Sequence, residues 1–417
     1  MRKPTLAFAL LLLLSGCLGG KDASGADDAD DGTPDQPGDG WAFSNILIGP
    51  GGDAETAVMV GPDGLVLACS HGGFGQPSPS WASEDAGDTW RRLDPQPNPV
   101  VSGDCDWAVL EDGTWGLVYD TIASSTVAVS EDRGATWDLN YGSAVPFGGV
   151  DRPWLAAEGN TFYLAYANVM ASEPAVNSLA VSHDGGHTWT EHHIAHTASL
   201  EQSDRPNTVI GHPLVADGTI RIPLASADLS SGGPTWLSFA VSRDEGATWT
   251  EEPVAGPYQA YFHLPVASRA PDGTLFITKP EGDSDGSLID VLISHDDGET
   301  WATVHVADDV QFPSVTGPWV DARPDGSATL TWLQQDDDGN RTVWAARIGA
   351  DGAIVHPPRA LSAPVQDGSV FEFIMLDHDE AGRAFIVYPM DTGDCTKTTP
   401  AARGRNAQCV WLLREDA

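Results

Sequence analysis

The sequence of 417 residues predicts an all-β fold, a seven-bladed β-propeller of four-stranded antiparallel blades. Three observations lead to this prediction. An eight-residue motif recurs along the chain, a strand–turn–strand unit precedes each copy, and one β-like segment near the start of the folded part has no blade of its own. Repeats of about 40–50 residues with several short strands each are typical of propeller blades.

The N-terminal 40 residues are expected to lie outside this fold. The basic start Met1–Lys3 is followed by the apolar run Leu6–Leu14, which is too short for a bilayer span of about 20 residues and is typical of an export signal. Residues 18–40 are rich in Asp, Gly and Pro and contain few apolar side chains, so we expect a disordered acidic tether. Residues 1–17 are then the signal peptide, and residues 41–417 form the propeller.

The signal ends in Leu14-Ser15-Gly16-Cys17, which resembles the lipobox of prokaryotic lipoproteins. The resemblance implies that Cys17 carries the lipid and that the protein is exported and anchored at the cell surface or outer membrane of a prokaryote.

The composition is strongly acidic, with 60 Asp and Glu against 21 Lys and Arg and a formal net charge of −39. Such a surface repels nucleic acid and anionic lipid headgroups. We therefore expect no nucleic-acid partner, and membrane contact only through the lipid anchor. Adaptation to salty surroundings is the simplest explanation of the charge. The chain is expected to act as a monomer.

The recurring motif is Ser-x-Asp-x-Gly-x-Thr-Trp, which occurs five times without a mismatch. The Asp can accept hydrogen bonds from backbone N–H groups of a turn, the Gly supplies a positive φ, and the Trp begins the next strand. Each copy therefore predicts a tight hairpin, with a structural role for its aspartate. These aspartates are Asp85, Asp132, Asp184, Asp244 and Asp296. A decayed sixth copy lies at Gly349–Gly352.

The strand–turn–strand unit occurs seven times, and one unit is expected in each blade. The units span Ala57–Ala68, Trp107–Tyr119, Trp154–Ala165, Pro213–Pro223, Leu264–Thr278, Trp319–Trp332 and Glu372–Tyr388. The seventh is followed by the strand Val410–Arg414 and has no motif copy. We expect Trp41–Ile48 to supply its outer strand, because this closes the ring and removes the free sheet edges. A six-bladed ring with an extra hairpin is the alternative.

Four cysteines besides Cys17 form an even set, and an exported protein is expected to pair them in two disulfides. Sequence alone allows three pairings. The blade arrangement favours Cys69–Cys105 and Cys395–Cys409.

The repeated motif resembles the Asp-box, or BNR, repeat of sialidases and related propellers. The resemblance implies that each box joins the third and fourth strands of a blade and lies far from the active site. Sialidase catalytic domains have six blades, so seven blades would be a departure from that family.

Candidate site residues lie in the loops that lead into the first strands. Sialidases hold a substrate carboxylate with arginines and use a Tyr nucleophile with a Glu partner and an acid/base Asp. By resemblance, these catalytic roles fall to Arg152, Arg205, Tyr261, Glu372 and Asp104. Substrate binding is assigned to Asp151, Asp204, Trp154, His263 and Trp319. Alternatively, Arg152 and Arg205 pair with the neighbouring aspartates and only rigidify blades 3 and 4.

No metal or cofactor is predicted. The acidic turns Asp283–Gly286 and Asp336–Gly339 could hold calcium, but neither continues into a full calcium loop. His192, His193 and His196 fall on different faces of one strand.

Two function classes remain open. One is a surface protein that recognises glycans and can also cleave them as a sialidase-like glycoside hydrolase. The other is a non-catalytic propeller that binds a protein partner. The fold does not decide between them.

Overall fold

A computed structural model describes residues 40–51, 54–71, 78–93, 103–121, 124–141, 150–168, 176–194, 207–227, 235–260, 264–283, 286–312, 317–366, 374–390 and 409–417. All of them belong to one compact unit, Thr33–Ala417. The predicted signal peptide and Cys17 lie outside the described residues, as does the tether as far as residue 39. No helix among the described residues is long and apolar enough to cross a membrane.

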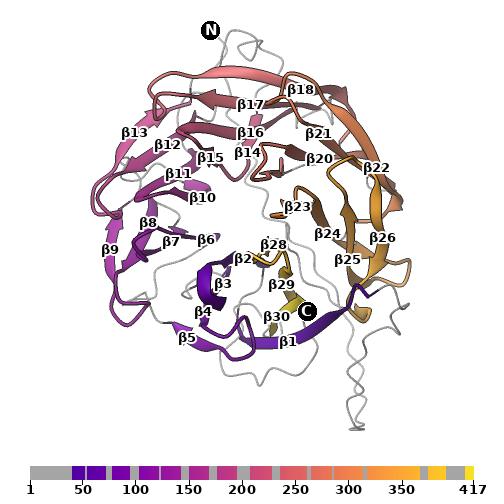
Figure 1. Ribbon diagram of the computed structural model, residues 1–417, viewed down its shortest axis with the longest axis horizontal. Helices are drawn as coiled ribbons and strands as arrows, with labels where there is room; N and C mark the ends of the chain where they lie inside the picture. Colours follow the sequence, from indigo (N-terminus) through magenta and orange to yellow (C-terminus); the bar gives the residue numbers. More distant parts are fainter. Residues whose placement is uncertain are drawn as a thin grey trace, which may run out of the picture. The chain divides into compact units, whose positions relative to one another are not determined.

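The strands of the described residues form seven antiparallel sheets arranged as a ring (Figure 1). This confirms the predicted seven-bladed propeller and excludes the six-bladed alternative. Each blade runs from an inner strand beside the central channel to an outer strand at the rim.

The blades are numbered in chain order. Blade 1 contains β2 (Ala54–Val60), η1 (Pro62–Gly64, a 3-10 turn), β3 (Val66–His71), β4 (Ser80–Ser83) and β5 (Arg91–Leu93). Blade 2 contains β6 (Cys105–Val109), β7 (Trp115–Thr121), β8 (Ser124–Ser130) and β9 (Asp138–Tyr141). Blade 3 contains β10 (Val150–Glu158), β11 (Thr161–Asn168), β12 (Val176–Ser182) and β13 (Thr190–His193). Blade 4 contains β14 (Asn207–Ile210), β15 (Leu214–Ala216), β16 (Thr219–Ala227), β17 (Thr235–Ser242) and β18 (Thr250–Tyr258). Blade 5 contains β19 (Ala267–Arg269), β20 (Leu275–Asp283), β21 (Gly286–Ser294) and β22 (Ala302–Val310). Blade 6 contains β23 (Trp319–Ala322), β24 (Ala328–Gln335), β25 (Asn340–Ile348), β26 (Ile354–Ala360) and β27 (Val365–Gln366). Blade 7 contains β28 (Met375–His378), β29 (Ala384–Met390), β30 (Cys409–Glu415) and β1 (Phe43–Pro50).

Blade 7 closes the ring with the first strand of the fold, as predicted. β1 pairs with β30 in a register that runs from Phe43 opposite Glu415 to Pro50 opposite Cys409. In Figure 1 the indigo β1 therefore lies beside the yellow end of the chain. β1 thus covers the outer edge of β30 along this register. Ring closure therefore joins the start of the fold to its end.

Blade 4 differs from its prediction at the inner strand. The sequence predicted one strand, Pro213–Ala216, whereas both β14 and β15 pair with β16 on either side of an interruption at Gly211–Pro213. At Gly211 a Cβ atom would lie 1.8 Å from the carbonyl oxygen of Pro265 in blade 5. Only glycine allows the two blades to approach so closely.

The five motif turns form hairpins between third and fourth strands, and each aspartate is bound within its own turn. In the second copy, the Asp132 carboxylate accepts hydrogen bonds from the Thr136 N–H at 2.8 Å and the Thr136 hydroxyl at 2.6 Å, while the Ser130 hydroxyl accepts one from the Gly134 N–H at 2.7 Å. The same bonds recur around Asp85, Asp184, Asp244 and Asp296. Hydrogen bonds from Thr136 lower the pKa of Asp132 to about 2. Each carboxylate therefore stabilises a turn.

Candidate functional site

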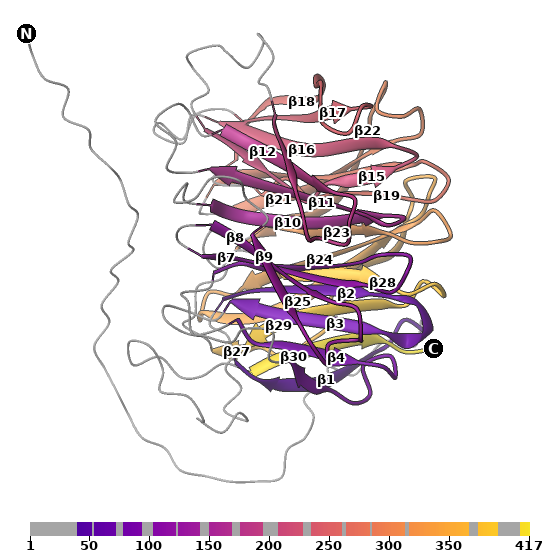
Figure 2. The same ribbon diagram turned by 90° about the vertical axis from the view of Figure 1, so that its left-hand side faces the viewer.

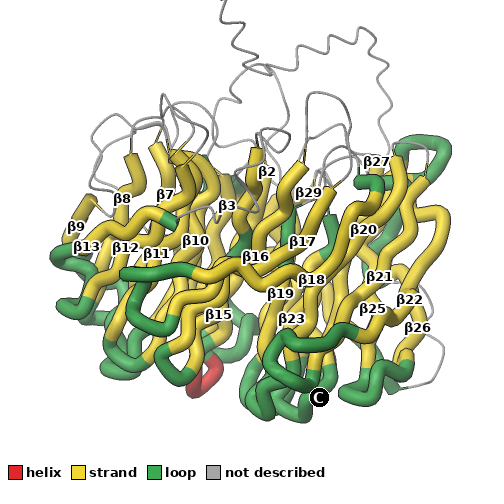
Figure 3. The backbone as a smooth tube through the Cα atoms, turned by 90° about the horizontal axis from the view of Figure 1, so that it is seen from above, coloured by secondary structure: helices red, strands yellow, loops and turns green. Residues whose placement is uncertain are grey.

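The ring has two faces that differ in how the chain crosses them. The turns between first and second strands and the motif turns gather at one face, which we call the turn face (Figures 2 and 3). The inner strands β2, β6 and β10 begin at the opposite face, which we call the start face. Antiparallel pairing also brings the ends of the second strands β3 and β7 to the start face.

Two indoles meet across the central channel. The rings of Trp154 in blade 3 and Trp319 in blade 6 have centroids 5.9 Å apart, and the residues are 1% and 5% exposed. Blades 3 and 6 are not neighbours in the ring, so this contact spans the channel. Trp154 also donates a hydrogen bond from Nε1 to the carbonyl oxygen of Ile210 at 3.1 Å. Stacking of either ring on a sugar stays a prediction, and it requires the two indoles to separate.

A cavity of about 420 Å³ occupies the channel, lined by inner-strand residues of all seven blades, Trp319 among them. Its buried carboxylates connect neighbouring blades. The Asp106 Oδ2 atom accepts the Leu155 N–H at 2.8 Å, and Asp377 Oδ2 accepts the Val60 N–H at 2.6 Å. Burial, with a further contribution from the negative charge of Asp321, raises the pKa of Asp377 to about 8. These carboxyl groups are therefore used in holding the ring together.

Two histidines complete this network. His378 Nδ1 lies 2.7 Å from Asp321 Oδ2, and its Nε2 lies 2.9 Å from the Thr329 hydroxyl. His212 Nε2 lies 3.3 Å from Asp106 Oδ2. Burial works to lower the pKa of His212, but the Asp106 carboxylate outweighs it and raises that pKa above its ordinary value. These carboxylates and imidazoles of the channel thus have partners in other blades.

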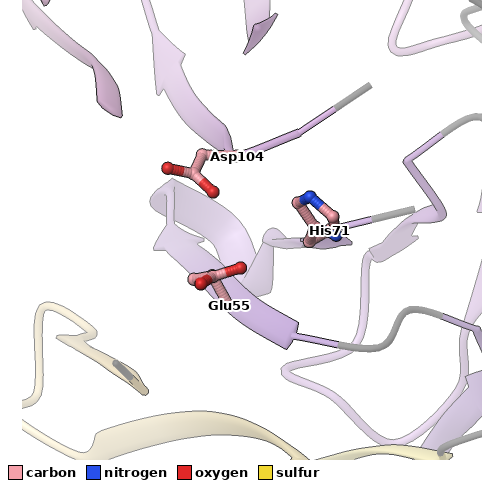
Figure 4. A group of neighbouring side chains, drawn as sticks. All are labelled: Glu55, His71 and Asp104. Carbon is pink, nitrogen blue, oxygen red and sulfur yellow. The ribbon is translucent and has the colours of Figure 1, made fainter. Parts of the chain in front are cut away.

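A separate cluster of charged side chains lies at the start face of blades 1 and 2. Glu55 comes from β2, His71 ends β3, and Asp104 precedes β6. One ligand atom of each lies within 4.8 Å of those of the other two, and Figure 4 shows the three side chains around a common space. The disulfide Cys69–Cys105, which the sequence predicted, joins β3 to β6 directly beneath the cluster, two residues before His71 and one after Asp104.

A second group shares Asp104 and extends to blade 3. The carboxylates of Asp104, Asp120 and Asp151 also have oxygen atoms within 4.8 Å of one another. Burial, together with the charges of Asp104 and Asp151, raises the pKa of Asp120 well above its ordinary value. We call the five residues Glu55, His71, Asp104, Asp120 and Asp151 the start-face cluster.

Arg152 lies next to this cluster in an unusual backbone conformation. Its φ is 53°, in the left-handed region, and its side chain is largely buried. The guanidinium Nε lies 3.9 Å from Asp151 Oδ2. This is the pairing expected if Arg152 binds the neighbouring aspartate and only rigidifies blade 3.

The structure brings together some of the predicted site residues. Asp104, Asp151 and Arg152 converge at the start face, whereas Trp154 and Trp319 lie in the channel. Other predictions fall outside the described residues and stay predictions: Asp204, Arg205, Tyr261, His263 and Glu372. Cys395 is also outside them, and Cys409 is disulfide-bonded.

Neither Glu55 nor Asp120 was predicted from the sequence to be a site residue. Each is the only charged residue of its strand and lies near the end of that strand at the start face. This position could have identified both residues from the sequence, because a polar side chain at a strand end on this face reaches the channel mouth.

Comparisons with known proteins show the fold alone. No protein-family model and no curated protein sequence matches this chain. A polysaccharide lyase is similar in structure, with a TM-score of 0.55 and 13% identity over 88% of this chain and 90% of the lyase. A protein of unknown function from Dyadobacter fermentans has a TM-score of 0.52 and 16% identity over 91% of this chain and 100% of its own. A PL25 ulvan lyase bound to -[GlcA(1-4)Rha3S]- has a TM-score of 0.51 and 13% identity over 74% of this chain and 81% of the lyase.

Proposed function

We propose that this protein binds a glycan at the start face of blades 1 to 3. The observation that carries the proposal is the convergence of the start-face cluster with Arg152 at one end of the channel. Carboxylates accept hydrogen bonds from sugar hydroxyls, and imidazole and guanidinium groups donate them, so this set offers both kinds of partner to a sugar. Structural similarity to two polysaccharide lyases supports a glycan as the ligand.

Binding without cleavage is the form of the proposal that the geometry supports best. Arg152 is paired with Asp151, and Trp154 and Trp319 are in contact across the channel. Hydrolysis of the sialidase type would need a set of arginines around one substrate carboxylate. Of the arginines predicted to bind a substrate carboxylate, Arg152 is the only one among the described residues, and it lies beside the cluster.

We further propose that the protein acts outside the cytoplasm, anchored through a lipid on Cys17. The lipobox-like segment and the acidic tether support this location. Metabolic labelling with a radioactive fatty acid tests it. Label in the wild-type chain and none in Cys17→Ser is the expected result, and equal label in both would contradict it.

The binding proposal is tested with the purified full chain on a panel of immobilised neutral and acidic polysaccharides. We expect retention on at least one member, and weaker retention of Arg152→Gln. Arg243→Gln is the matched control, because Arg243 lies on the exposed motif turn of blade 4. Absence of retention on every polysaccharide, or equal retention of both variants, would count against a glycan site here.

A protein-binding propeller is the second candidate, and the contact of Trp154 with Trp319 across the channel favours it. The same preparation is therefore incubated with fluorogenic aryl glycosides, sialosides included. Turnover that is lost in Arg152→Gln and kept in Arg243→Gln would instead show a glycosidase. If the panel shows neither retention nor turnover, the protein-binding candidate replaces the glycan proposal.

A further inference from the structure

The start-face cluster combines a donor set with a spacing that suits a metal ion. Ligand atoms that each lie about 2.0–2.4 Å from one cation are at most about 4.8 Å apart. Glu55, His71 and Asp104 meet this limit, and so do Asp104, Asp120 and Asp151. The two groups share Asp104, which places its carboxylate at the centre of the set.

The backbone fixes these side chains in place. The Asp120 N–H donates to the Asp104 carbonyl oxygen at 3.1 Å, and the Gly103 N–H donates to the Asp120 carbonyl oxygen at 3.0 Å. The disulfide Cys69–Cys105 ties the strand that carries His71 to the strand that follows Asp104. When the ligands of a site are already held in place at the spacing that a cation requires, little conformational entropy is lost as the cation binds.

Gly103 supplies the room for the Asp120 carboxylate. A Cβ atom at Gly103 would lie 2.1 Å from Asp120 Oδ1 and 2.9 Å from its carboxyl carbon. No larger residue is compatible with this position of the carboxyl group. The glycine thus forms a cradle that fits Asp120 in its observed orientation.

Asp120 also has a carboxylate oxygen whose bonding needs are not met. Its Oδ1 atom is buried and accepts no hydrogen bond within the part of the chain that the structure describes. Burial of this oxygen is unfavourable, and the charges of Asp104 and Asp151 add repulsion that His71 and the Gly103 N–H offset only in part. A cation bound among these carboxylates would remove the repulsion between them.

We propose that one divalent cation binds in the start-face cluster, held by Asp104 and His71 with Glu55, Asp120 and Asp151 around it. One imidazole among carboxylates favours Mn²⁺ or Zn²⁺ over Mg²⁺, which keeps most of its water ligands. Neither of the acidic turns considered in the sequence analysis forms this site. In one of them, Asp336 accepts hydrogen bonds from the N–H groups of Asp338 and Asn340 within its own turn.

The inference stands apart from the proposed function, because cation binding is measured without any glycan. The full chain is stripped with EDTA, dialysed, and titrated with Mn²⁺ and separately with Zn²⁺, using calorimetry and, for Mn²⁺, electron paramagnetic resonance. We expect saturable binding of one Mn²⁺ per chain. Loss of a ligand in His71→Ala, or of a neighbouring negative charge in Asp120→Asn, should weaken it by about tenfold or more.

Two matched controls separate this site from general charge. His305→Ala removes an imidazole that also lies between two carboxylates, Asp290 and Asp308, but on the outer strand β22. Asp63→Asn removes one negative charge at the opposite end of the hairpin that carries Glu55 and His71. Both controls should bind Mn²⁺ as the wild type does. Circular dichroism verifies that each variant is folded, and His71→Ala tests the site if Asp120→Asn does not fold.

Three results would overturn the proposal. One is the absence of saturable binding of either ion up to millimolar concentrations. Another is unchanged affinity in His71→Ala. The third is equal weakening in His71→Ala and His305→Ala, which would assign the binding to scattered surface groups.

Discussion

The disulfide Cys69–Cys105 offers the sharpest quantitative prediction. It closes a loop with a sequence separation of 36 residues, and both cysteines are buried. Restricting the unfolded chain by a loop of this length is worth about 4 kcal/mol in the chain-entropy relation. Replacing both cysteines by serine, in Cys69→Ser/Cys105→Ser, should therefore lower the free energy of unfolding by about 4 kcal/mol.

The assay is urea denaturation of the full chain, followed by tryptophan fluorescence. For a slope of about 3 kcal/mol per molar urea, the midpoint should fall by about 1 M. Substitution is preferable to reduction, because Cys409 is also disulfide-bonded and a reductant would break both bonds. A loss below about 1 kcal/mol would refute the reasoning, since it would mean that strand pairing alone holds β3 against β6.

The same variant tests how the cluster is positioned. The disulfide holds the strands that carry His71 and Asp104, so Mn²⁺ affinity should fall in the double variant while the fold persists. Unchanged affinity in a folded double variant would show that the disulfide stabilises the ring without positioning the cluster.

The remaining predictions concern pH, the channel and the cation. The folded state holds the Asp377 proton up to about pH 8, whereas an unfolded Asp releases it near 3.8, so this group destabilises the fold as pH rises between these values. The raised pKa of His212 acts in the same direction. Its contribution to the stability of the fold is present below pH 6.5 and is lost as pH rises through the pKa of the folded state. Tm should therefore fall from about pH 5 to about pH 8, and a level or rising Tm would contradict this assignment. Trp154→Ala should cost about 3–5 kcal/mol in urea denaturation, because it opens a void beside Trp319 in the channel, and a loss within 1 kcal/mol would show that the ring contact is dispensable. If cation and glycan share the start face, EDTA should weaken glycan retention and added Mn²⁺ should restore it; retention that is indifferent to both would place the two sites apart.

Much of the fold was predictable because its determinants are local. Each Ser-x-Asp-x-Gly-x-Thr-Trp turn forms its own hydrogen bonds, so its hairpin can be read from eight consecutive residues. Ring closure was predictable from counting strands, since Trp41–Ile48 had no other partner. The split inner strand of blade 4 was not, because it depends on the approach of Gly211 to Pro265 in the next blade.

The site was only partly predictable for the same physical reason. Asp104, Asp151 and Arg152 stand out in the sequence because they lie in polar segments before inner strands. Asp120 lies at the end of an apolar strand, and its significance comes from burial beside Asp104 and from the space left by Gly103. Those relations join residues of different strands, and no local pattern in the sequence encodes them.

The central claim is that the start face of blades 1 to 3 binds the glycan. The most direct test measures the dissociation constant of the full chain for the polysaccharide that retains it best, and compares Asp151→Asn with Asp217→Asn. Both changes remove one negative charge, but Asp217 lies at the turn face of blade 4 and is almost fully exposed. We predict that Asp151→Asn binds about tenfold or more weakly, since hydrogen bonds to charged groups are worth about 1.5–3 kcal/mol, and that Asp217→Asn is unchanged. Equal affinity of the two variants would contradict the claim.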